Sequence, residues 1–203
     1  MIREVREAGP EDGETSPRRW APNSKELHKM RFLMENERWI RRQISWIPED
    51  KIQGIVEWGA GDGRLLGHLS KFGATIGVDS HSRPAGLPDE VDWLQGSPWE
   101  VRAAGSVLVV NGVFHHFESG ELLQLGRKVE AFDFLVVAEP WRSAEVLRGR
   151  DGGGADEAAR LESFVKSGFQ PGELQEALGL KGWRFYEKSS RHGALRSVAW
   201  KEA

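Results

Sequence analysis

Short apolar stretches alternate with amphipathic stretches along most of the chain. From residue 52 onward, apolar runs of strand length are separated by segments whose apolar residues recur at helical spacing. The predicted strands are Ile52–Trp58, Thr75–Val78, Val91–Leu94, Ser106–Val110 and Phe132–Ala138. The predicted helices are Gly63–Phe72, Ser119–Val129, Glu157–Lys166 and Pro171–Leu178. This alternation indicates a parallel sheet that is covered by helices on both faces.

The last two apolar runs predict a different kind of strand pairing. Trp183–Lys188 and Leu195–Trp200 are separated only by the short segment Ser189–Ala194. A connection this short joins antiparallel strands, because a parallel pair needs a long crossover. We therefore expect an α/β protein with a three-layer αβα sandwich. Its seven-stranded sheet should be mostly parallel, with the antiparallel C-terminal strand inserted beside the fifth.

The N-terminal part differs in composition from the rest. Residues 1–23 are charged and rich in proline, which predicts a flexible arm, although Trp20 offers a group that can dock. A helix over residues 24–47 should follow and end before Pro48. Its apolar stripe consists of Met30, Leu33, Ile40, Ile44 and Ile47. Residues 24–203 are expected to form one domain, with a flexible loop at residues 149–156.

Composition narrows the possible functions. The 203 residues include no cysteine, which excludes disulfides, thiolate metal ligands and a cysteine nucleophile. No cluster of carboxylates and an amide suggests a metal site either. The formal net charge of −3 is not typical of proteins that bind duplex nucleic acid. No apolar run approaches the ~18 residues of a membrane-spanning helix. We expect a cytoplasmic protein without nucleic-acid or membrane partners, and its oligomeric state stays open.

A glycine cluster between the first predicted strand and helix carries the strongest functional pattern. Gly59, Gly61 and Gly63 permit a tight turn and a close approach of a ligand to the backbone. Asp79 ends the next strand, at the distance expected for an acid that binds ribose hydroxyls. A dinucleotide-binding fingerprint would place glycine where this chain has Arg64.

The glycine cluster resembles motif I of class I S-adenosylmethionine (SAM)-dependent methyltransferases, where an acid, here Glu57, precedes the first glycine by two residues. Asp79, the His-His-Phe run within Val109–Phe117 and the terminal hairpin continue this resemblance, in order, over roughly residues 52–200. The resemblance implies a Rossmann-like fold, SAM as cofactor and a small-molecule acceptor, as in the methyltransferase type 11/12-like branch. The expected cofactor-binding residues are Glu57, Trp58, Gly59, Gly61, Gly63, Asp79, Ser80, Gly96, Ser97, Asn111 and Gly112.

The family often has an aspartate after the third strand, near the adenine amino group. This chain has Leu94-Gln-Gly-Ser97 there, so Gln95, Ser97 or the backbone would take that role. Two other functions remain open on the same residues. One is a catalytically inactive nucleotide-binding module of this fold. The other, which Arg64 and the terminal hairpin disfavour, is an NAD(P)-dependent oxidoreductase.

The candidate catalytic residues follow the fourth and fifth strands. His115 or His116 lies where the transferred methyl group is expected and is a candidate general base. Packing within the loop is the alternative role for both. Because they are adjacent, we expect their side chains to diverge and only one to contact the acceptor. Glu139 is a second catalytic candidate, and Trp141 and Arg142 are candidates for binding an acceptor's ring or anion.

Overall fold

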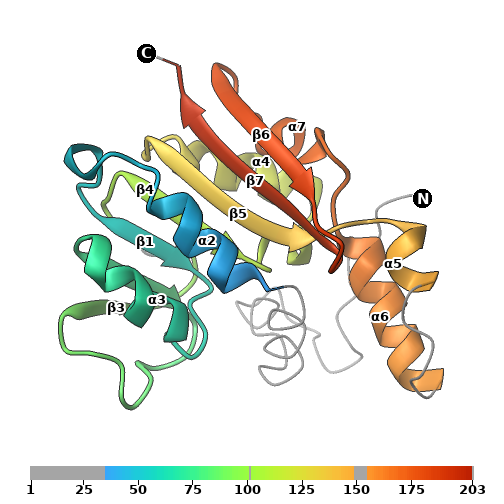
Figure 1. Ribbon diagram of the computed structural model, residues 1–203, viewed down its shortest axis with the longest axis horizontal. Helices are drawn as coiled ribbons and strands as arrows, with labels where there is room; N and C mark the ends of the chain where they lie inside the picture. The colour runs from blue at the N-terminus through green and yellow to red at the C-terminus, as the bar shows by residue number, and fades with distance from the viewer. Residues whose placement is uncertain (1–34, 101, 149–154, 203) are drawn as a thin grey trace.

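A seven-stranded sheet forms the centre of the protein (Figure 1). The computed structural model describes residues 35–100, 102–148 and 155–202. The strands are β1 (Ile55–Trp58), β2 (Thr75–Asp79), β3 (Val91–Gln95), β4 (Val107–Asn111), β5 (Phe134–Pro140), β6 (Trp183–Ser189) and β7 (Ala194–Lys201). Their spatial order is β3-β2-β1-β4-β5-β7-β6. The sequence-based prediction of the sheet is confirmed, because β1 to β5 pair in parallel and β7 pairs antiparallel with both β5 and β6.

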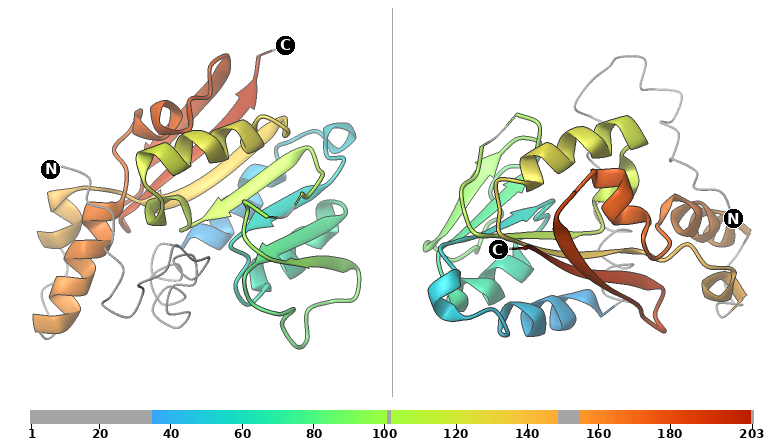
Figure 2. Two further views of the ribbon diagram at one scale, coloured as in Figure 1. Left: turned by 180° about the vertical axis from the view of Figure 1, so that it is seen from behind. Right: turned by 90° about the horizontal axis from the view of Figure 1, so that it is seen from above.

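Helices cover the sheet on both faces. The α-helices are α2 (Asn36–Ile44), α3 (Arg64–Leu69), α4 (Ser119–Val129), α5 (Ala144–Arg148), α6 (Ala155–Ser167) and α7 (Glu173–Leu178). Helices α2 and α3 lie on one face and α4 and α7 on the other (Figure 2). Helices α5 and α6 lie beyond the carboxyl end of β5 (Figure 1). Within the described residues, none of the helices has both the length and the apolarity to cross a lipid bilayer.

The core has two sides because the buried strands alternate between them. Along β4, Leu108 and Val110 pack with the cluster that includes Leu122 and Leu125 of α4. Val107 and Val109 pack instead with Ile40 and Ile44 of α2. All five residues of β4 are buried. A strand that is buried on both faces has no polar side, which explains its continuous apolar sequence.

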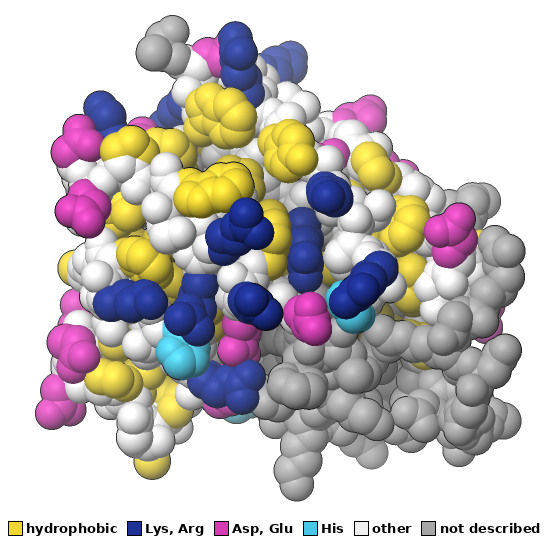
Figure 3. Space-filling view, viewed as in Figure 1, with side chains coloured by type: hydrophobic (Ala, Val, Ile, Leu, Met, Phe, Trp, Pro, Cys, Tyr) yellow, Lys and Arg dark blue, Asp and Glu magenta, His cyan; other side chains and the backbone are white. Residues whose placement is uncertain are grey.

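The β6–β7 hairpin is covered on one face only. Arg184, Tyr186 and Lys188 of β6 lie beside Trp200, Val198 and Arg196 of β7 on the same side of the sheet as α2. The side chains of Tyr186 and Trp200 are 62% and 37% exposed, and Figure 3 shows hydrophobic side chains among Lys and Arg on this side of the molecule. One-sided cover explains why more buried and exposed residues alternate along β6, whereas every residue of β4 is buried.

Several predicted boundaries need correction. Helix α2 ends at Ile44, not at residue 47, because the following turn is closed by the tighter bonds Trp46 N–H to Gln43 O and Ile47 N–H to Ile44 O. The first strand starts at Ile55, not at Ile52, and α5 was not predicted. Ala155 and Asp156, predicted as loop, begin α6. The predicted arm, the first part of the N-terminal helix and residues 149–154 lie outside the described residues.

Gly126 allows α4 to approach the end of α7 closely. A Cβ atom built on Gly126 would lie only 1.7 Å from the carbonyl oxygen of Leu178. We therefore expect Gly126→Ala to lower the free energy of unfolding by ~2 kcal/mol or more, despite alanine's higher helix propensity. Gly120→Ala, in the first turn of the same helix, is the matched control, because its Cβ would have no neighbour within 4 Å. That variant should be unchanged or up to ~1 kcal/mol more stable in urea denaturation. Equal stability of the two variants would contradict this account of the packing.

Candidate functional site

The candidate site lies where the strand order of the sheet reverses. Strands β1 and β4 are neighbours, but β1 continues into α3 on one face of the sheet and β4 leads towards α4 on the other (Figure 2). The two connections diverge at the carboxyl edge of the sheet, and the point where the strand order reverses is the usual ligand site of open α/β sheets. The predicted site residues Trp58, Asp79 and Asn111 end β1, β2 and β4, and Glu139 is the penultimate residue of β5.

The glycine loop has the backbone conformation that the sequence indicated. Gly59, Gly61 and Gly63 have φ values of 72°, 59° and 72°, in the left-handed region where a side chain is disfavoured. Gly63 immediately precedes α3, and a Cβ atom there would also lie 2.7 Å from the side chain of Leu87. The three glycines are therefore required by the turn itself, whatever ligand the loop binds.

Asp79 joins the glycine loop to the loop that follows β2. Its side chain is only 8% exposed. Its Oδ2 accepts a hydrogen bond from the backbone N–H of Gly61 at 2.8 Å. Its Oδ1 accepts one from the backbone N–H of His81 at 3.0 Å and lies 2.7 Å from Nδ1 of the same residue. The structure thus brings the predicted ribose-binding acid against the predicted glycine loop. Sequence reasoning missed His81. Its position two residues after Asp79 is the sequence signal that could have identified it.

The aromatic residue of the loop has a role other than stacking on a cofactor. Trp58 is 4% exposed, and its ring packs edge-to-face against Phe114 and Phe132, with centroids 6.4 Å and 6.2 Å away. The indole is therefore part of the core, and only the backbone of Trp58 is suited to contact a ligand. Glu57, the preceding residue, is also buried in β1.

The predicted adenine-binding segment after β3 is held by its own contacts. The backbone N–H and the hydroxyl of Ser97 both donate to one oxygen of Glu100, each at 2.9 Å, and these bonds lower the pKa of Glu100. Gly96 donates its N–H to the carbonyl of Asp79, and Gln95 donates its side-chain amide to the carbonyl of Ser80. The Ser97 hydroxyl is thus bound to Glu100. Glu100 is an additional polar group at this end of the site, and sequence reasoning missed it.

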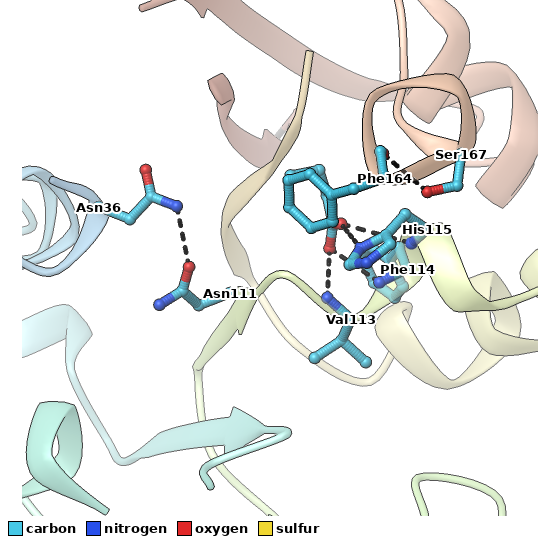
Figure 4. Close-up of polar contacts among 8 residues, drawn as sticks. Asn36, Asn111, Val113, Phe114, His115, Phe164 and Ser167 are labelled. Carbon is cyan, nitrogen blue, oxygen red and sulfur yellow. Dashed lines mark hydrogen bonds and ion pairs between the residues drawn. The ribbon is translucent and has the colours of Figure 1, made fainter. Parts of the chain in front are cut away.

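Glu139 organises the turn that follows β4, in which Figure 4 labels Val113, Phe114 and His115. Its side chain is fully buried, and Oε1 accepts the backbone N–H groups of Val113 and Phe114, each at 2.8 Å. Oε2 accepts the N–H of His115 at 3.3 Å and lies 2.8 Å from Nδ1 of that histidine. Burial raises the pKa of Glu139, and the backbone N–H groups oppose this shift. The carboxyl group has about four hydrogen-bonding positions, so none is left for an acceptor's proton. We therefore interpret Glu139 as a positioning residue and not as the catalytic base.

The two histidines lie together and do not diverge. They belong to the 3₁₀ turn Phe114–His116, and their ring centroids are 3.9 Å apart at an interplanar angle of 40°. The expectation of divergent side chains is wrong, because the turn and the anchor of His115 on Glu139 bring both rings to the same side. His115 is 1% exposed and also contacts Phe164 of α6 edge-to-face, whereas His116 is half-buried.

The predicted anion-binding residue is used within the fold. Arg142 is 3% exposed, donates to the carbonyl of Gly168 at 3.0 Å and forms an ion pair with Glu173. These contacts fasten the segment after β5 to the start of α7. Two of its guanidinium nitrogens thus serve to pack the loop, which was the equally open alternative to binding an anionic acceptor.

Helix α2 contributes polar residues that sequence analysis did not predict. Asn36, its first residue, donates its side-chain amide to Oδ1 of Asn111 at 3.0 Å (Figure 4). Glu37 binds the guanidinium of Arg64, which follows the glycine loop directly, and this contact raises the pKa of Arg64. No local signal in the sequence marks either contact, because each partner lies far away along the chain.

The fold is similar to solved methyltransferase structures at low sequence identity. A putative O-methyltransferase from Nostoc punctiforme is 17% identical with a TM-score of 0.66, over 88% of this chain and 58% of that one. Human N-acetylserotonin methyltransferase in complex with SAM is 16% identical with a TM-score of 0.62, over 95% of this chain and 60% of that one. The chain therefore spans less than two thirds of the length of either protein.

A third similar structure matches over nearly its whole length. The plantazolicin methyltransferase BpumL, in complex with a triazolic desmethylPZN analog and SAH, is 12% identical with a TM-score of 0.61, over 89% of this chain and 98% of that one. No protein-family model and no curated protein sequence matches the chain. The likenesses establish that the chain has the fold of class I SAM-dependent methyltransferases, and the fold expected from motif I is confirmed.

The raised pKa of Glu139 predicts a pH-dependent contribution to stability. Because its pKa is raised, the carboxyl group of Glu139 stays protonated to higher pH in the folded state than in the unfolded state. Its contribution to the free energy of unfolding therefore falls as the pH rises above about 4.5. The free energy of unfolding of the unaltered protein, relative to Glu139→Gln, should therefore fall as the pH rises above about 4.5. The exposed Glu176→Gln is the control, since its carboxyl group is not buried. Denaturant titrations measure the difference in free energy of unfolding between the unaltered protein and Glu139→Gln. If this difference is constant or increases with pH, burial is not the dominant influence on the pKa of Glu139.

Proposed function

We propose that this protein is a SAM-dependent methyltransferase that acts on a small-molecule acceptor. The observation that carries this proposal is the bond between the carboxyl group of Asp79 and the N–H of Gly61 at the point where the strand order reverses. It joins the two elements that the motif I resemblance assigns to the ribose and methionine parts of the cofactor. Arg64, in place of the glycine of a dinucleotide fingerprint, favours this cofactor over NAD(P).

The similar structures support the same choice of cofactor and acceptor class. One contains SAM, and BpumL contains SAH together with analogs of a natural product. The loop residues of this chain fit such a cofactor, because the left-handed glycines bring the backbone close to a ligand and Asp79 supplies an acidic acceptor. Glu57, Gly59, Gly63, Ser80, Gly96, Asn111 and Gly112 complete the proposed cofactor site, with Trp58 and Ser97 contributing backbone only.

His115 is the better-placed general base of the two histidines. SAM, when bound, supplies an electrophilic methyl group on a sulfonium. The chain's own task is to align an acceptor, exclude water and, for a protonated nucleophile, remove a proton. Glu139 holds Nδ1 of His115, which leaves Nε2 as the nitrogen that exchanges a proton with an acceptor. His116, whose ring lies beside that of His115, completes the wall of the proposed acceptor site.

Titration calorimetry of the unaltered protein with SAH and, separately, with NADH tests the cofactor. We expect SAH to bind and NADH not to bind. Asp79→Ala should weaken SAH binding by ~1–3 kcal/mol, because it removes a buried acceptor for ribose hydroxyls and for the glycine loop. Asp79→Asn separates these effects, since it keeps an acceptor for the Gly61 N–H and should lose less affinity. The exposed Asp92→Ala is the control. Binding of NADH alone would replace this proposal with an oxidoreductase, and binding of neither would favour an inactive module.

A screen of small molecules with methyl-labelled SAM should identify an acceptor and permit a test of His115. If His115 is the base, His115→Asn should lower kcat by ~10²–10⁴-fold and leave SAH affinity nearly unchanged. His116→Asn should mainly raise KM, since His116 would contact the acceptor without transferring its proton. The reverse pattern would assign the base to His116, and an effect of both variants on SAH affinity alone would remove both from catalysis.

A further inference from the structure

Asn36 carries a buried polar atom that no other described residue satisfies. The residue is fully buried at the start of α2, and its amide nitrogen donates to Asn111. Its amide oxygen faces away from Asn111 (Figure 4) and has no hydrogen-bond partner in the part of the chain that the structure describes. Leaving such a group unpaired destabilises the folded state, so an unsatisfied buried amide needs a reason.

The backbone before Asn36 is strained. Glu35 has a φ of 51°, and among the described residues it is the one residue other than glycine with a positive φ. A residue with a side chain is disfavoured in this backbone region, and the conformation persists when the surroundings impose it. Strain next to an unsatisfied buried amide indicates that this turn has a function besides helix initiation.

Contacts from three parts of the molecule hold the turn in this position. Arg196 of β7 donates to the carbonyl of Glu35 at 3.2 Å. Glu37 binds Arg64, which directly follows the glycine loop. Asn36 itself binds Asn111 at the end of β4. The amide is therefore fixed between the glycine loop and the end of β4, on the opposite side of that loop from Asp79.

We propose that Asn36 binds the amino-acid end of the cofactor, which rests on the proposed function. Asp79 lies at the end of β2 and takes the ribose, so the remainder of the cofactor extends from the glycine loop towards β4, where Asn36 lies. The amino-acid end carries an ammonium, which donates hydrogen bonds, and a carboxylate, which accepts them. The unpaired oxygen of Asn36 accepts from the ammonium, and the bond to Asn111 fixes the amide's orientation. Asn36 thus orients the sulfonium without contacting the acceptor.

Two ligands that differ only at the amino-acid end test this assignment. SAH carries the amino-acid group, and 5′-methylthioadenosine has the same nucleoside and thioether without it. In calorimetry with the full chain, we expect Asn36→Ala to weaken SAH binding about 10-fold, which corresponds to ~1.4 kcal/mol. Its affinity for 5′-methylthioadenosine should stay within about twofold of that of the unaltered protein, because the contacts to the nucleoside remain. Gln43→Ala, later on the same helix, is the control and should change neither affinity.

The outcomes separate this inference from the proposed function. Unchanged SAH affinity in Asn36→Ala would overturn the inference alone. An equal loss for both ligands would also overturn it, because the residue would then only support the scaffold. Failure of the unaltered protein to bind SAH would overturn the proposed function and this inference with it. If the alanine variant does not fold, Asn36→Ser serves instead. The same selective loss is expected, because a serine side chain is too short to reach both Asn111 and the ligand.

Discussion

Buried carboxyl groups hold the loops on either side of the strand-order reversal, and the geometry of the site depends on these contacts. Asp79 of β2 binds the loop after β1, and Glu139 of β5 binds the turn after β4. Each acid thus belongs to the strand outside the central β1–β4 pair. The two loops are therefore anchored to strands on opposite sides of the central pair. A buried carboxyl group is costly unless it is hydrogen-bonded. The conformation of each loop and the position of the carboxyl group that binds it therefore depend on each other.

Helix α2 crosses this framework from the side. Its apolar residues pack on β4 and β5, but its first turn reaches the glycine loop through Glu37 and the end of β4 through Asn36. The contact between Asn36 and Asn111 joins residues 75 positions apart in the chain. A movement of α2 would therefore change both halves of the site at once, so the packing of an N-terminal helix is directly linked to the geometry at the carboxyl edge.

The parts of the structure that were predictable from sequence are those with local causes. The buried strands are apolar on both faces, the glycine turns need left-handed residues, and the short final connection permits only an antiparallel pair. The five-residue α5 is too short for helical spacing to show in the sequence. The contacts of Asn36, Arg142 and Glu139 join distant segments. The ring contact between His115 and His116 depends on the 3₁₀ turn. None of these features leaves a pattern in the neighbouring residues, so they were missed or assigned a different role.

The hydrogen bonds at the carboxyl edge also limit the chemistry that the site can perform. Asp79, Glu139 and Arg142 are all engaged with the backbone or with other side chains, and the Ser97 hydroxyl is bound to Glu100. Polar groups that hold loops are not available to change partners during a reaction. A reaction whose barrier is lowered mainly by alignment suits such a site, and displacement at a methyl group is one. Under the proposed function, proton transfer would fall to His115, which Glu139 holds in place. Under the same proposal, α5 and α6 would adjoin the acceptor, because these helices lie beyond the carboxyl end of β5 and Phe164 of α6 contacts His115.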